Sequence, residues 1–188
     1  MPAYVTAVGA LLFLALAYFA VGQAAANRNG AQGAADAAAL AAASDARDQI
    51  GERLVGPDLN RDDLVDLVNG RLFLTSSGCA AADRFAAKNK ANSESCTRVN
   101  APGNGFAVTV RSRESVGNTV IPGTEGTYSK ATARAVIESR CTLKDAEEED
   151  ETVVEIVLSC RGKTVTIDPE KPDSLPRLGE LFTVRLVR

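Results

Sequence analysis

The sequence predicts an α+β protein, in which one long N-terminal helix precedes a small antiparallel-sheet head domain tied by two disulfides. No proline interrupts the chain between Pro2 and Pro57, and most of this stretch is apolar or alanine-rich. From Phe106 onward apolar and polar residues alternate, which is typical of half-buried strands. The four cysteines are widely spaced, and the chain has no histidine, so disulfides are favoured over a metal site. We therefore divide the chain into a helix, residues 1–55, and a head domain, residues 56–188.

The N-terminal stretch has two parts, an apolar run from Val5 to Val21 and an alanine-rich tract from Gly22 to Ala46. A continuous helix over Pro2–Ile50 would be about 70 Å long at ~1.5 Å per residue. The apolar run is apolar on every side of such a helix, which suits a transmembrane span from Val5 to Val21. We expect the helix to end near Gly56.

Small residues recur at every fourth position of this helix and predict a face that packs closely against neighbouring helices. The predicted packing face consists of Gly22, Ala26, Gly30, Ala34, Ala38 and Ala42. Helix propensity alone would explain the alanines, but each glycine costs about 1 kcal/mol in a helix interior, so close packing is favoured. We expect Gly30 and Ala34 to lie outside the core of the head, so that leucine at either position would disturb helix association only.

A cleaved signal peptide is the alternative for this region, because Ala24 and Ala26 satisfy the small-x-small cleavage pattern. A retained anchor is favoured, since no basic segment precedes the apolar run and the small-residue repeat continues through the cleavage point. The first positive side chain, Arg28, follows the run, which by the positive-inside rule would place the head in the cytoplasm. Paired cysteines indicate an oxidising compartment instead, and we give them more weight.

Beyond the long helix the sequence predicts short elements in the order expected for an α+β domain. Asn60 and Gly70 bound a short helix, and a helix over Ala80–Ala91 lies in an otherwise loose surface segment. Five strands follow, at Phe106–Arg111, Ala131–Cys141, Val153–Cys160, Lys163–Ile167 and Leu181–Val187, with a turn at Arg161-Gly162.

Four cysteines allow three pairings, and we expect Cys79 to pair with Cys96 and Cys141 with Cys160. The first bond would tie the loose segment, where closing a loop of this length contributes ~3 kcal/mol in the chain-entropy model. The second would cross-link two strands that flank the acidic run Asp145–Asp150.

Composition and motifs exclude several functions. The net charge of -3 and the lack of a basic-aromatic pattern argue against nucleic acid. The chain has no histidine, no GxSxG and no phosphate-binding loop, so we expect no enzyme, cofactor or metal, although a carboxylate-pair enzyme stays open. The acidic run is interpreted as a solvated hairpin tip rather than a cation site. Asp58, Asn60 and Asp62 lack the glycine and glutamate that complete a calcium loop.

The segment Arg28–Ala43, with AADAAALAAA at Ala34–Ala43, resembles the N-terminal helix of TadE/TadG-like proteins of the tight-adherence (Flp) pilus system. All of Pro2–Arg47 is similar to versions found in high-GC Gram-positive bacteria. The resemblance implies a type IV pilin-like helix that is held in the membrane before assembly and packs in the filament afterwards.

Its implied partners are other pilin subunits, the assembly machinery and lipid. Its implied location is the cell membrane, single-pass with the C-terminal domain outside, and then the pilus or cell surface. The size of the head favours a minor pilin or assembly component, because major Flp subunits are little more than the helix. Two alternatives are a stand-alone membrane-anchored surface binding module and a secreted enzyme with a cleaved signal.

Overall fold

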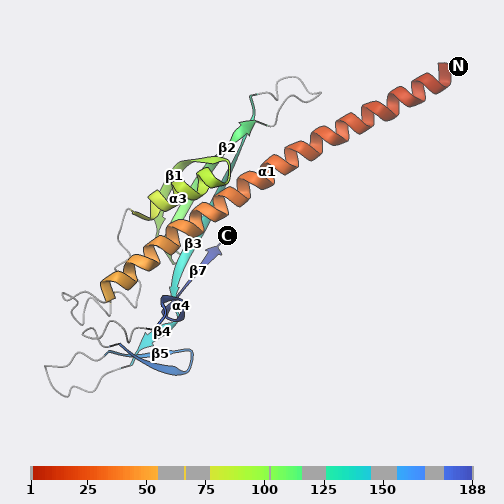
Figure 1. The fold of residues 1–188 in the computed structure, drawn as a ribbon. Coiled ribbons are helices and arrows are strands. Elements are labelled where there is room, and N and C mark those ends of the chain that lie inside the picture. The colour runs from red at the N-terminus through yellow and green to blue at the C-terminus, as the bar shows by residue number, and fades with distance from the viewer. Residues whose placement is uncertain are drawn as a thin grey trace, which may run out of the picture.

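A single helix, α1 (Pro2–Leu54), runs through the molecule and sets its length (Figure 1). Its 53 residues span about 80 Å at ~1.5 Å per residue. The computed structural model describes residues 2–54, 66, 77–101, 103–115, 126–144, 156–167 and 176–187. The N-terminal part of α1 projects beyond the rest of the chain, whereas its C-terminal part lies along a sheet (Figure 1). The prediction of one uninterrupted N-terminal helix is confirmed.

The main sheet is antiparallel and has the strand order β1-β2-β3-β7. Its strands are β1 (Ala91–Val99), β2 (Asn104–Ser115), β3 (Tyr128–Ser139) and β7 (Phe182–Val187). Alternation decides which face is buried, because Phe106, Val108 and Val110 of β2 join α1 in one core cluster. The opposite face is more polar, and there the hydroxyls of Thr109 and Thr132 lie 2.9 Å apart across β2 and β3.

A second helix, α3 (Ser77–Lys88), packs beside α1 and against β1. Gly78 makes this approach possible, since a Cβ there would lie 2.9 Å from the carbonyl oxygen of Ala42 and 2.7 Å from the Phe106 ring. The predicted helix Ala80–Ala91 therefore exists but begins and ends three residues earlier. It cannot reach Ala91, because Lys90 takes a φ of 56° in the turn that leads into β1.

A smaller antiparallel sheet lies at the other end of the head, beyond the C-terminal part of α1 (Figure 1). It consists of β4 (Cys141–Leu143), β5 (Ile156–Cys160) and β6 (Lys163–Ile167). Arg161 and Gly162 connect β5 to β6 with φ of 48° and 84°, the backbone that a two-residue hairpin turn requires. A short helix, α4 (Leu178–Leu181), leads into β7 and places Leu181 and Phe182 in the core.

Three sequence predictions need correction. The segment Ala91–Val99 is an edge strand and not a loose loop. The predicted strand Ala131–Cys141 is two strands, because the chain leaves the main sheet at Arg140 and Cys141 begins the smaller one. Leu181 belongs to α4 instead of β7. The predicted helix Asn60–Gly70, apart from Asp66, and the acidic run Asp145–Asp150 lie outside the described residues.

Candidate functional site: the long helix and its surroundings

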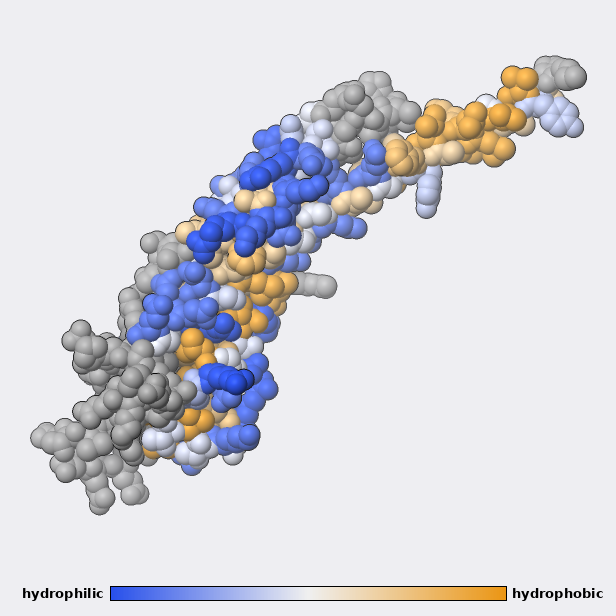
Figure 2. All heavy atoms as spheres, viewed as in Figure 1, coloured by the Kyte–Doolittle hydropathy of each residue, from blue (hydrophilic) through white to orange (hydrophobic). Residues whose placement is uncertain are grey.

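The first half of α1 exposes most of its apolar side chains, although Ala20 is buried, at 6% exposed. Leu11 is 67% exposed and Phe13 66%, and Tyr4, Val5, Val8, Leu12, Leu14, Leu16, Tyr18, Phe19 and Val21 are also exposed. Figure 2 shows this half as a nearly continuous hydrophobic rod. Burying one such side chain contributes about 1.5–3 kcal/mol, so water is an unfavourable environment for the whole segment. By length and composition α1 could cross a membrane, and it is the one such helix in the described part of the chain.

The second half of α1 forms the centre of the head's core. Its buried residues are mainly alanines, namely Ala31, Ala34, Ala35, Ala38, Ala39, Ala41, Ala42, Ala43 and Ala46, followed by Ile50. They contact β2 and β3 of the sheet on one side and α3 on the other. Because alanine is small, the helix backbone can approach both elements closely, while its high helix propensity keeps the helix intact. One helix thus has an uncovered apolar half and a covered alanine half.

The head divides the predicted packing face into two surfaces. Ala34, Ala38 and Ala42 are at most 1% exposed and are covered by the same chain. The expectation that Ala34 lies outside the core of the head is therefore wrong, and Ala38 and Ala42 are buried in the same core. Four-residue spacing of small side chains admits any close neighbour, and here the neighbours are strands and α3 rather than a second copy of the helix. Gly22, Ala26 and Gly30 are exposed, and a Cβ on Gly22 or Gly30 would meet nothing within 4 Å.

The level at which α1 leaves the head is fixed by contacts on the β1–β2 side. The Asn27 side-chain amide donates to the carbonyl oxygen of Glu114 at 3.5 Å. The Lys90 ammonium lies 3.6 Å from the Glu114 carboxylate. A cleft of about 400 Å³ between these elements is lined by polar and small residues of α1, Ala26 and Gly30 among them, by the α3–β1 turn and by the end of β2. Asn27 therefore lies where α1 meets the end of β2, and further toward the N-terminus Ala20 is also buried, at 6% exposed.

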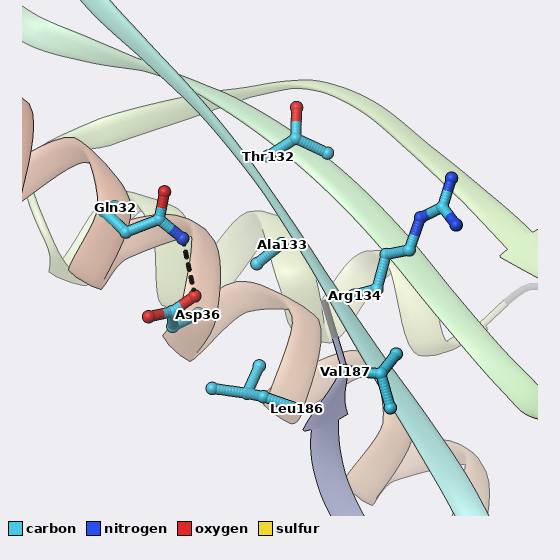
Figure 3. Close-up of a pocket in the computed structure, with 7 residues that line it drawn as sticks. All are labelled: Gln32, Asp36, Thr132, Ala133, Arg134, Leu186 and Val187. Atoms are coloured by element: carbon cyan, nitrogen blue, oxygen red, sulfur yellow. Dashed lines mark hydrogen bonds between the residues drawn. The ribbon is translucent and has the colours of Figure 1, made fainter. Parts of the chain in front are cut away.

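A larger groove of about 650 Å³ lies on the other side of α1, where β7 ends beside β3 (Figure 3). Its lining residues are Gln32 and Asp36 of α1, Thr132, Ala133 and Arg134 of β3, and Leu186 and Val187 of β7. The Gln32 amide donates to the Asp36 carboxylate at 2.8 Å. Figure 3 shows the Arg134 guanidinium pointing away from Asp36, so the charged groups do not converge on one ligand position. Sequence reasoning missed this groove because its walls come from three distant segments.

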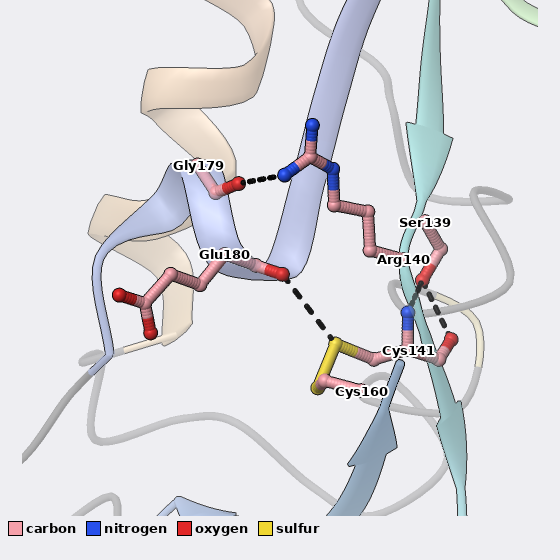
Figure 4. Close-up of a disulfide and its surroundings, with 6 residues drawn as sticks. All are labelled: Ser139, Arg140, Cys141, Cys160, Gly179 and Glu180. Carbon is pink, nitrogen blue, oxygen red and sulfur yellow. Dashed lines mark hydrogen bonds between the residues drawn. A yellow bond between two sulfur atoms is a disulfide. The ribbon is translucent and has the colours of Figure 1, made fainter. Parts of the chain in front are cut away.

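Both predicted disulfides are present. Cys79–Cys96 joins α3 to β1, and Cys141–Cys160 joins residues that lie directly opposite each other on β4 and β5. Next to the second bond, Arg140 connects the two sheets to α4 and β7 (Figure 4). Its backbone N–H donates to Leu181 at 2.8 Å, and its guanidinium donates to Gly179 at 3.0 Å and to Thr183 at 3.1 Å. The two disulfides thus cross-link α3 to the edge strand of the main sheet and two neighbouring strands of the smaller sheet.

The ionisable groups of the described residues form no cluster of three or more metal-ligating side chains. All four cysteines are bonded in disulfides. Glu138 has a lowered pKa, because the Arg185 guanidinium donates to its carboxylate with two nitrogens across β3 and β7. Both side chains are largely exposed, at 40% and 51%, so the pair is a surface contact of the sheet.

Comparison with known proteins finds similarity in the long helix. Residues 3–45 match the Tad family model, described as "Putative Flp pilus-assembly TadE/G-like". No curated protein and no solved structure matches the chain. The family description names no bacterial group and so gives no support to the expected likeness to high-GC Gram-positive versions. The match spans the whole uncovered half of α1 and most of its alanine half. Over its N-terminal helix this chain is therefore similar to TadE/G-like proteins of Flp pilus assembly.

Proposed function

We propose that this protein is a membrane-anchored minor pilin or assembly component of a tight-adherence (Flp) pilus, with a structural role in surface adhesion and no catalytic role. One observation carries the proposal: the helix that matches the pilus-assembly family is uncovered and apolar in its first half and built into the head in its second. A helix of this kind holds the head rigidly while offering its free half to lipid or to other helices.

In this proposal the free half of α1 spans the cell membrane from about Val5 to Val21 before assembly. The head then lies on the extracytoplasmic side, where its two disulfides would be stable. After assembly the same half packs against other pilin subunits, and the head faces outward at the cell surface. Gly22, Ala26 and Gly30 are the part of the small-residue face that remains exposed, and Ala26 and Gly30 also line the cleft between α1 and the end of β2.

Leucine substitutions on the open small-residue face test this proposal. Gly22→Leu and Gly30→Leu should reduce co-purification with pilus subunits from membranes of a piliated host, because a bulky side chain separates the helix backbones. Ala24→Leu is the matched control, since at 100° per residue Ala24 lies on the opposite side of the helix. Equal loss with all three variants would mean that Gly22 and Gly30 do not form the packing face.

A stand-alone anchored binding module is the alternative in which α1 serves only as a tether. It would be favoured if none of the three leucine variants changed co-purification or piliation. The secreted-enzyme alternative requires cleavage near Ala26, and mass spectrometry of the membrane-extracted protein tests it. A mature chain that begins at Asn27 would contradict the pilin proposal, whereas peptides from residues before Asn27 would support the retained anchor.

A further inference from the structure

We propose that the end of the head from which α1 emerges binds the headgroups of anionic membrane lipids. The residues that carry the proposal form a basic rim, defined as Arg28, Lys88, Lys90, Arg111, Arg113 and Lys130, and all six side chains are exposed. This inference rests on the membrane location in the proposed function, and it adds a second membrane contact besides the apolar helix.

Backbone contacts place the rim at one level of the molecule. The Arg113 N–H donates to the carbonyl oxygen of Lys90 at 2.8 Å, which joins the end of β2 to the α3–β1 turn. Arg111 lies opposite Lys130 in the β2–β3 register. The contact between Asn27 and Glu114 joins this group to the point where α1 leaves the head. The rim thus lies near the level of Asn27, with Arg111, Arg113 and Lys130 on the face of the sheet that points away from α1.

The rim has a surplus of positive charge among the described residues. Within the described ranges, two carboxylates form ion pairs with these six cations, with Glu94 2.8 Å from Lys130 and Glu114 3.6 Å from Lys90. The whole chain has a net charge of -3, so this group of six cations and two carboxylates has the opposite sign to the chain as a whole. Clusters of Lys and Arg beside a membrane helix are attracted to anionic lipids, and that attraction acts within a Debye length of the surface.

The position of the rim along α1 agrees with the thickness of a lipid headgroup layer. From Val21, the end of the apolar run, to Asn27 the helix rises about 9 Å at ~1.5 Å per residue. The polar layer on each side of the hydrocarbon core is about 5–8 Å thick. Lysine and arginine side chains extend several ångströms further and can follow the headgroups. Tyr128 lies at the same end, and the guanidinium carbon of Arg111 is 4.2 Å from the centre of the Tyr128 ring. Tyrosine is enriched at membrane interfaces.

Lysine labelling of the full-length protein in lipid nanodiscs tests the proposal. The discs contain either phosphatidylcholine alone or phosphatidylcholine with phosphatidylglycerol, and labelling with an amine-reactive ester is followed by mass spectrometry. We expect Lys88, Lys90 and Lys130 to react about threefold more slowly in the anionic discs, and the difference to disappear at about 0.5 M salt. Lys144 and Lys163 lie in or beside the smaller sheet at the far end and should react equally in both discs.

A double variant separates lipid contact from a local structural effect. In Lys90→Gln/Arg113→Gln the lipid-dependent difference at Lys130 should shrink, while Lys163→Gln should leave it unchanged. Thermal melting with intact disulfides checks that both variants remain folded. A full lipid-dependent difference at Lys130 in a folded double variant would overturn the assignment of these two cations to the binding surface.

The outcomes distinguish this inference from the proposed function. If the protein enters both discs and the rim lysines react equally, the rim proposal is overturned and the membrane anchor stands. If the protein enters neither disc, both are overturned. If protection appears in neutral discs and grows with protein density, the rim binds an acidic surface of another copy, and the lipid assignment is overturned.

Discussion

Gly78 and Ala42 show how little room separates the elements around α1. The carbonyl oxygen of Ala42 lies 2.9 Å from the position that a Cβ of Gly78 would occupy, and the Phe106 ring is 2.7 Å from it. Three elements meet at this point, namely α1, α3 and β2. The absence of a side chain at Gly78 is therefore a requirement of the head itself, whatever α1 does in the membrane.

The first prediction concerns Ala38, whose side chain is fully buried. Ala38→Leu should destabilise the head by about 1–3 kcal/mol, because a well-packed core must shift to admit the extra methylenes. The measurement is thermal or denaturant unfolding of the full chain in detergent. Ala24→Leu introduces the same side chain on the exposed half and should leave the melting temperature unchanged. Equal stability of the two variants would contradict the core assignment of Ala38.

A second prediction concerns the pKa of Glu138, which lies below its usual value of 4.5 because Arg185 donates to the carboxylate. A lowered folded-state pKa stabilises the head above the unfolded-state pKa, and this stabilisation is lost as the pH falls through the folded-state value. Because the pair is exposed, the effect on unfolding is small. NMR titration of the Glu138 carboxyl carbon should show a higher pKa in Arg185→Gln and no change in Lys130→Gln, whose partner is Glu94. An unchanged pKa in Arg185→Gln would exclude the contact.

At the scale of elements, β2 and β3 approach each other so closely at Gly105 that no side chain fits. A Cβ there would lie 1.9 Å from the carbonyl oxygen of Ala135 and 2.7 Å from the Cα of Val136. Both are backbone atoms of the paired strand and cannot move aside as a side chain could.

The third prediction follows from this approach. Gly105→Ala should destabilise the head by about 1–3 kcal/mol or shift the β2–β3 register, because the clash involves the ladder itself. Denaturant unfolding measures the first effect, and amide hydrogen exchange over β3 measures the second. Gly126→Ala is the control, since a Cβ there has nothing within 4 Å. A fully stable Gly105→Ala protein with native exchange would mean that the strands are further apart.

Much of the element order could be predicted from the sequence, and the failures have physical reasons. The absence of proline between Pro2 and Pro57 predicted α1. The alternation of apolar and polar residues on both sides of the Arg161-Gly162 turn predicted the β5–β6 hairpin. The edge strand β1 could not be predicted because its polar sequence, ANSESCTRV, shows little apolar alternation. It is joined to α3 by the Cys79–Cys96 disulfide. The break at Arg140 could not be predicted, because strand propensity does not show to which sheet a strand belongs. Here the residues before Arg140 belong to the main sheet and those after it to the smaller one.

The candidate site was predicted only in part, because the alanines of α1 do not reveal which element packs against them. The apolar run and both disulfides were read correctly, since hydropathy and cysteine spacing are direct signals. The alanines Ala34, Ala38 and Ala42 were assigned to a sister helix, because a small side chain suits close packing against any backbone. The grooves could not be predicted, since their walls come together only in the folded chain.

At the scale of the whole molecule, the fourth prediction separates the two halves of α1. A chain that begins at residue 27 should fold and remain soluble, because the buried alanines from Ala31 onward are all retained. A chain that begins at residue 44 should fail to fold, because it lacks most of the alanine surface that covers the sheet. Circular dichroism and thermal melting after oxidative expression measure both. A cooperative melt in the shorter chain would mean that the sheet and α3 form a core without α1.

Because α1 continues without a break from the apolar run into the core, it also fixes the rotational orientation of the head about the helix axis. Each residue turns the helix by about 100° and advances it by ~1.5 Å, so the number of residues between Val21 and Ala31 sets which side of the head faces a given neighbour. One alanine inserted there would rotate the head by about 100° around the helix axis and move it only ~1.5 Å along that axis. Seven inserted alanines, close to two full turns, would restore its direction while raising it by ~10 Å. Direction and height of the head can therefore be varied independently in this molecule.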